Sequence, residues 1–119
     1  MEEIPGAVDL GARLRSGAEP DTALIRQVGT LIGKLHREGF HHMDLKETNL
    51  VLDQKGVLHL IDLDGLLFLR DVPPRRVTLA LTRLQRGVEK CATISRRHRF
   101  LFLLNYCRAR GVRTLPRRS

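Results

Sequence analysis

The stretch that decides the fold of this chain is His-Met-Asp-Leu-Lys-Glu-Thr-Asn at residues 42–49, followed by Leu-Val-Leu at 50–52, Val-Leu-His-Leu-Ile at 57–61 and Asp-Leu-Asp-Gly at 62–65. The two runs rich in Leu and Val predict two short β-strands. Between them, Asp53-Gln54-Lys55-Gly56 ends in a glycine that can adopt the left-handed conformation that closes a hairpin. A hairpin over residues 50–61 returns the chain to where it started, and we therefore predict that Asp62 lies beside Asn49.

Three side chains of this stretch form a set that phosphoryl transfer can use. Asp44 can hold an acceptor hydroxyl and take its proton, while Asn49 and Asp62 offer the oxygen ligands that Mg²⁺ prefers. Lys46 is a point charge suited to a γ-phosphate. Two other interpretations stay open: a polar loop without chemistry, and a zinc site that begins at His41 and His42 but still needs further ligands.

The order His-x-Asp-Leu-x-x-x-Asn, then a hairpin and an Asp, resembles the catalytic and metal-binding loops of protein-kinase-like enzymes. The resemblance implies an α+β, protein-kinase-like fold, of which this chain is the mainly helical C-terminal lobe with a small β-hairpin. It implies ATP and Mg²⁺ as cofactors, with Mn²⁺ as an alternative metal. It also implies that Asp44 and Lys46 are catalytic, that Lys46, Asn49 and Asp62 bind the cofactor, that Asn49 and Asp62 hold the metal, and that His42 braces the loop.

Three departures from the pattern of regulated protein kinases narrow the family that this chain resembles. Met43 stands where regulated protein kinases carry an Arg, Asp64 stands where they carry a Gly, and the short segment after Gly65 has no Ala-Pro-Glu. Asp62-Leu63-Asp64 is similar to the motif of the lipopolysaccharide kinase family, which implies transfer of phosphate to a sugar hydroxyl of the lipopolysaccharide inner core. Asp64 could then be a metal ligand, a ligand of a sugar hydroxyl or a solvated carboxylate. A serine/threonine-protein-kinase-like or small-alcohol kinase and a non-catalytic basic binding module are the alternative functions.

The resemblance gives residues 1–119 the layout of one lobe, with a hinge-like lead at 1–7, a central helix at 21–40, the catalytic loop at 41–49, the hairpin at 50–61, the metal loop at 62–65 and terminal helices at 75–111. No Gly-rich phosphate loop, strand Lys or partner Glu precedes Asp44, so the N-terminal lobe of the family is absent from this sequence. We expect the chain to be a truncated form that is inactive or weakly active without that lobe.

The helical segments carry further expectations. Asp21 is a good N-cap for the central helix, and Gly29 and Gly33 suggest that another backbone packs closely against it. His36 is expected to be a packed histidine. A short helix is expected over 7–15, and the last helix is expected to pack through Phe100, Leu103, Leu104 and Cys107.

The 119 residues carry a net charge of +8, which predicts an anionic partner such as a nucleotide, an acidic glycolipid or an anionic membrane face. A nucleic-acid partner is not favoured because aromatic residues are too few for a stacking platform. No apolar run reaches the roughly 20 residues of a membrane span, and no secretory signal is visible. We therefore expect a cytoplasmic protein, with peripheral contact at the cytoplasmic face of the inner membrane as a further expectation.

Overall fold

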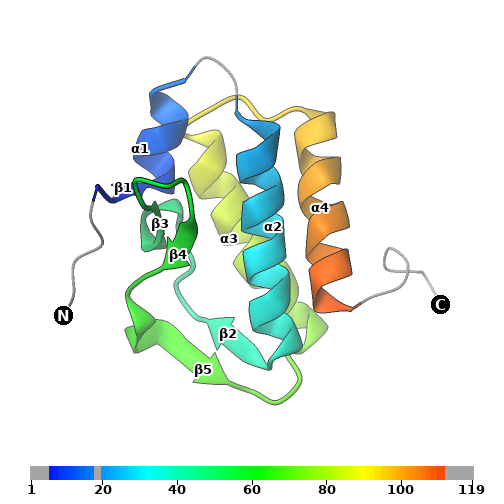
Figure 1. Cartoon of the computed structure of the whole chain (residues 1–119). Coiled ribbons are helices and arrows are strands. Elements are labelled where there is room, and N and C mark those ends of the chain that lie inside the picture. Colours follow the sequence, from blue (N-terminus) through cyan, green and yellow to red (C-terminus); the bar gives the residue numbers. More distant parts are fainter. Residues whose placement is uncertain (1–5, 18–19, 112–119) are drawn as a thin grey trace.

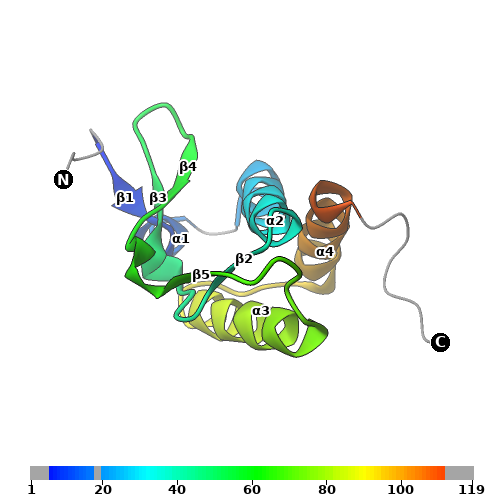
Figure 2. The same cartoon turned by 90° about the horizontal axis from the view of Figure 1, so that it is seen from below.

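The computed structural model of the chain describes residues 6–17 and 20–111 and has an α+β architecture (Figure 1). Three long helices stand side by side, and two small antiparallel sheets lie along one side and one end of them (Figures 1 and 2). In chain order the elements are β1 (Val8–Asp9), α1 (Leu10–Arg15), α2 (Thr22–Arg37), β2 (Phe40–His42), η1 (Glu47–Asn49), β3 (Leu50–Leu52), β4 (Leu58–Leu60), η2 (Leu63–Gly65), β5 (Leu66–Phe68), α3 (Pro74–Glu89) and α4 (Arg96–Arg110), where η marks a short 3₁₀ helix. None of the helices among these residues is long and apolar enough to cross a membrane.

Helix α2 is the central helix of the fold. The Asp21 side chain accepts a hydrogen bond from the backbone N–H of Ala23 at 3.0 Å, which confirms the predicted N-cap. The buried side chains of Leu24, Val28 and Ile32 form the middle of the hydrophobic core. The helix ends at Arg37, earlier than the predicted boundary at residue 40, because the chain turns at a left-handed Gly39 and enters β2.

Helix α4 packs on α2 across the two glycines, as predicted. A Cβ atom on Gly29 would lie 2.5 Å from the carbonyl oxygen of Phe102, and one on Gly33 would collide with the carbonyl oxygen of Tyr106. The two backbones therefore approach more closely than any larger residue at these positions would allow.

The face through which α4 packs agrees with the prediction at Cys107, which is buried in the core, but differs at Phe100 and Leu103. The side facing α2 carries Phe102, Tyr106 and Ala109, whereas Phe100 is 52% exposed and Leu103 is 43% exposed. Apolar residues occur on all sides of this helix, so its sequence period does not identify one packing face. The glycines of α2 determine which face of α4 packs, because they allow the close backbone contact. The rest of the prediction holds at the helix ends, where Ser95 caps the N-terminus and a left-handed Gly111 follows the C-terminus.

Replacing Gly33 by Ala is expected to destabilise the fold by about 2 kcal/mol, because the overlap with the α4 backbone outweighs a gain of about 1 kcal/mol in helix propensity. Gly87→Ala in α3 is the matched control, since the three atoms nearest to its new Cβ all belong to the movable end of the Glu47 side chain. Urea unfolding followed by far-UV circular dichroism measures both variants. Equal free energies of unfolding for the two variants would contradict the close α2–α4 packing.

The predicted hairpin is confirmed. Strands β3 and β4 pair antiparallel, and the turn between them has Gly56 at φ +83°. The Asp53 carboxylate accepts hydrogen bonds from the N–H groups of Lys55 and Val57 at 2.8 and 2.9 Å. Gln27 of α2 fixes the hairpin from outside, donating to the carbonyl of Gly56 at 3.0 Å.

Three strands, β1, β2 and β5, were not predicted. Val8 belongs to β1, which pairs with β3, and the first helix begins only at Leu10, so the expectation of a helix over 7–15 is wrong at its start. Strands β2 and β5 pair antiparallel, with the Phe40 and Phe68 rings 5.4 Å apart. Strands of two or three residues are too short to show an alternating pattern, and these three lack the turn signal that identified β3 and β4 as a hairpin. Of the hinge-like lead, only Gly6 and Ala7 fall within the described residues.

A buried polar cluster joins α2, α4 and the segment before α3. His36 Nδ1 lies 2.5 Å from the Tyr106 hydroxyl oxygen, to which Arg110 also donates at 3.0 Å; Arg110 donates further to the carbonyl of Val72 at 3.1 Å. Since the hydroxyl oxygen already accepts from Arg110, its proton is free to bond His36 Nδ1. Burial and then the charge of Arg110 lower the pKa of His36 from 6.5 to about 4. His36 is thus a packed, neutral histidine, as predicted.

Candidate active site

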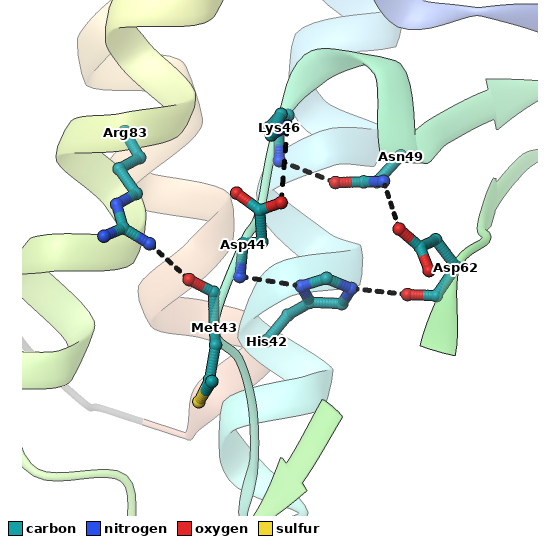
Figure 3. Close-up of polar contacts among 7 residues, drawn as sticks. All are labelled: His42, Met43, Asp44, Lys46, Asn49, Asp62 and Arg83. Carbon is teal, nitrogen blue, oxygen red and sulfur yellow. Dashed lines mark hydrogen bonds and ion pairs between the residues drawn. The ribbon is translucent and has the colours of Figure 1, made fainter. Parts of the chain in front are cut away.

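The loop that follows β2 is held by His42 at its base (Figure 3). The backbone N–H of Asp44 donates to His42 Nδ1 at 3.1 Å, and His42 Nε2 lies 2.7 Å from the carbonyl oxygen of Asp62. Because Nδ1 accepts, the ring proton is on Nε2 and donates to that carbonyl. The buried His42 side chain therefore links the loop that carries Asp44 to the loop that carries Asp62.

A second set of contacts closes the two loops on each other. The N–H of Met43 donates to the carbonyl of Gly65 at 2.8 Å. A Cβ on Gly65 would lie 3.1 Å from the His42 ring, so a side chain at this position would require the ring to shift slightly. Asp62 has a left-handed backbone, φ +60°, which is uncommon outside glycine and occurs here at the turn between β4 and η2. This conformation directs the carbonyl of Asp62 to His42 and its carboxylate to Asn49 (Figure 3).

The hairpin brings Asn49 and Asp62 together, as their spacing predicted. Asn49 Nδ2 donates to Asp62 Oδ2 at 3.5 Å, and Asn49 Oδ1 accepts from the backbone N–H of Lys46 at 3.1 Å. A backbone bond from Ile61 N to the Asn49 carbonyl, at 2.8 Å, extends the pairing to this point. Asn49 is buried, so its orientation is fixed by these partners.

Asp44 and Lys46 lie at the open side of the loop. Lys46 Nζ is 3.3 Å from Asp44 Oδ2. The Lys46 side chain is 55% exposed and the Asp44 side chain is 57% exposed. An ion pair this exposed contributes little to stability and can separate at little cost. The loop itself is anchored by Leu45, which is buried in the hydrophobic core. The backbone of the loop is thus fixed, while the charged ends of Asp44 and Lys46 can move. This combination suits side chains that bind a substrate.

The oxygen-bearing groups fit a hard divalent cation. Asn49, at the end of η1 just before β3, and Asp62, just after β4, both carry side-chain oxygen atoms, and Mg²⁺ commonly takes one or two protein oxygen ligands together with waters and phosphate oxygens. Within residues 6–17 and 20–111, no group of three or more His, Cys, Asp or Glu side chains converges as a metal site. Asp64 is exposed in η2, where the chain leaves the site.

One contact of the site was not predicted. Arg83, on α3, donates through Nη1 to the carbonyl of Met43, the residue immediately before Asp44 (Figure 3). It ties α3 to the loop across 40 positions of sequence. Arg83 is exposed on α3, and nothing in the local sequence indicates that this part of the helix borders the loop.

These contacts define the class of the protein. A loop carrying Asp44 and Asn49 after the central helix, followed by a hairpin that returns Asp62 to Asn49, is the arrangement of the catalytic and metal loops in the protein-kinase-like fold.

The chain belongs to the lipopolysaccharide kinase (Kdo/WaaP) family, whose model matches residues 1–102. It is similar to proteins named 3-deoxy-D-manno-octulosonic acid kinase. A relative from Xylella fastidiosa strain 9a5c is 41% identical over 64 residues, which are 54% of this chain and 25% of the relative. One from Vibrio parahaemolyticus is 35% identical over 63 residues, 53% of this chain and 26% of the relative. The chain thus spans about a quarter of the length of these relatives.

Proposed function

We propose that this chain is the catalytic, C-terminal lobe of an ATP-dependent kinase that phosphorylates a sugar hydroxyl of the lipopolysaccharide inner core. The observation that supports this most strongly is the contact between Asn49 and Asp62, beside a loop that carries Asp44 and is tied to Asp62 through His42, in a member of this family. The similarity to proteins named 3-deoxy-D-manno-octulosonic acid kinase favours an octulosonic acid residue as the acceptor.

In this proposal Asp44 accepts a hydrogen bond from the acceptor hydroxyl and takes its proton late in the reaction. The transition state of phosphoryl transfer is loose, so positioning and charge contribute more than base strength. Lys46 leaves Asp44 and binds the γ-phosphate, where its charge stabilises the equatorial oxygens. The transfer is direct, from ATP to the sugar oxygen, without a covalent enzyme intermediate.

Asn49 and Asp62 are the proposed ligands of Mg²⁺, with Mn²⁺ as an alternative. When bound, the metal neutralises charge on the β- and γ-phosphates of ATP. The contacts from His42 to Asp62 and from Lys46 N–H to Asn49 hold both ligands in place before binding. We propose that the adenine and the α-phosphate are bound by a nucleotide lobe outside this set of residues, and that efficient turnover requires it.

We further propose that the protein works in the cytoplasm, with peripheral contact at the anionic inner face of the membrane. Exposed Phe100 and Leu103 on α4 lie among Arg96, Arg97 and Arg99. Basic side chains attract anionic head groups and apolar side chains can enter the interface.

The metal assignment is tested by replacing Asp62 with Asn in the product of the reading frame extended upstream. We expect the affinity for Mg²⁺–ATP, measured by calorimetry, to fall at least about tenfold, because a charged metal ligand is lost. Asp64→Asn is the matched control, since it removes a neighbouring exposed carboxylate. If Asp62→Asn binds Mg²⁺–ATP like the unmodified protein, the assignment of Asp62 is wrong; if only Asp64→Asn is impaired, the metal ligand is Asp64.

A further inference from the structure

A cavity of about 210 Å³ lies among α1, α2, α3 and α4. Most of its lining is aliphatic or aromatic, including Leu14, Leu24, Val28, Leu84, Val88 and Phe102. The polar lining residues are Gln85, His98 and Arg99, which come from the C-terminal half of α3 and the first turn of α4. None of the residues proposed for catalysis or metal binding lines it.

The cavity exists because α4 packs on α2 rather than on α3. The two glycines of α2 draw the Phe102 and Tyr106 backbone toward that helix. Space is left on the side of α4 that faces α3, and the side chains of Leu81 and Val88 border it without filling it. The space is open to solvent on one side, so part of its apolar lining is in contact with water. An apolar ligand would remove that lining from water, which is favourable.

The polar end of the cavity is basic. Residues 85–99 contain five cationic side chains (Arg86, Lys90, Arg96, Arg97 and Arg99) and one carboxylate, Glu89. Glu89 is already paired: its Oε2 atom accepts from Arg99 at 2.6 Å and from Gln85 at 3.2 Å. This cluster bridges α3 and α4, and the segment 85–99 that carries it has an excess of positive charge. A ligand that fits must therefore combine an apolar body with an anionic end.

We propose that this cavity binds an acyl chain of an anionic lipid, with the head group held by the arginines of the first turn of α4. A chain of methylene groups can enter a space of about 210 Å³ and cover its apolar lining, while an anionic head group meets the basic residues at its polar end. The inference does not rest on the proposed function, because the binding needs neither nucleotide nor any of the residues proposed for catalysis.

The test is calorimetric titration of the full chain with single-chain alkyl phosphates below their micelle concentration. Octyl, nonyl and decyl phosphate should bind with an affinity that rises up to about fourfold per added methylene, as expected for burial in an apolar site. Leu81→Trp, which fills the cavity, should abolish binding. Leu79→Trp is the matched control, because Leu79 is 46% exposed on the same helix and does not line the cavity.

A second filling variant, Val88→Phe, guards against misfolding of the first, and circular dichroism verifies the fold of each.

Decyl phosphate should bind at least about tenfold more tightly than decyl trimethylammonium at low salt, and replacing Arg96 and Arg97 by Gln should reduce that preference. Vesicles of phosphatidylglycerol form a separate arm: binding to them that is lost in Leu81→Trp identifies a bilayer lipid as the source of the chain. Equal binding by Leu81→Trp and Leu79→Trp, no dependence on chain length, or no binding at all would overturn the proposal.

Discussion

Replacing Asp44 by Asn is expected to lower the rate of phosphate transfer by about 10² to 10⁴, the range typical for loss of a positioned acid–base group. The amide cannot accept the proton of the acceptor hydroxyl. The fold should be unchanged, because the Asp44 carboxylate is 57% exposed and its only ion-pair partner among the described residues is Lys46. A steady-state assay of the product of the reading frame extended upstream, with saturating acceptor, should therefore show a fall in kcat with the far-UV circular dichroism spectrum preserved.

Asp71→Asn is the control for this variant, since Asp71 is an exposed carboxylate outside the two loops. Its kcat should equal that of the unmodified enzyme. Full turnover by Asp44→Asn would show that the acceptor proton leaves by another route, and Asp44 would then be a residue of the loop with no part in the chemistry.

Lowering the pH from 7.5 to 4.5 is expected to cost roughly 2 to 3 kcal/mol of stability through His36 alone. The pKa of His36 is lowered from 6.5 to about 4 in the folded protein, so in this window the unfolded chain binds a proton that the folded chain does not. Stability from this group is complete above pH 6.5 and is lost as the pH falls toward 4. Protonation would place a second donor against the Tyr106 hydroxyl, which already accepts from Arg110. Urea unfolding at several pH values measures the effect.

His36→Asn supplies the matched variant, because its side-chain oxygen can accept from Tyr106 without titrating. This variant should be less stable at neutral pH but should lose much of the dependence between pH 6.5 and 4.5. The pKa of the buried His41, lowered by burial and by nearby Arg76, adds to the slope in the same direction. A slope in His36→Asn as steep as in the unmodified chain would show that His36 is not the group responsible.

Local signals in the sequence were enough to predict the site region and the central helix. The hairpin follows from two Leu- and Val-rich runs around a turn that ends in Gly56, and its closure places Asp62 beside Asn49. Asp21 could be identified as the N-cap of the central helix because its side chain can accept a hydrogen bond from the first helical turn. Gly29 and Gly33 identify the close helix contact, since glycine in a helix interior is otherwise unfavourable.

Features that depend on partners distant in sequence could not be predicted in this way. The packing face of α4 is chosen by the glycines of α2, and its own apolar residues point in all directions. Pairing of β2 with β5 and the bond from Arg83 to the Met43 carbonyl join segments far apart in the chain. A short strand or an exposed arginine has the same local sequence whether or not such a partner exists.

The measurement that tests the central claim most directly is transfer of the γ-phosphate of ATP to purified lipopolysaccharide core in the presence of Mg²⁺. It compares this chain with the product of the reading frame extended upstream, each beside its Asp44→Asn version. We predict phosphate on a core sugar with the extended product and its loss in Asp44→Asn. Transfer to protein serine or threonine instead would favour a protein-kinase-like activity. If neither product transfers phosphate, yet this chain binds anionic lipid, the catalytic account is contradicted and a basic binding module takes its place.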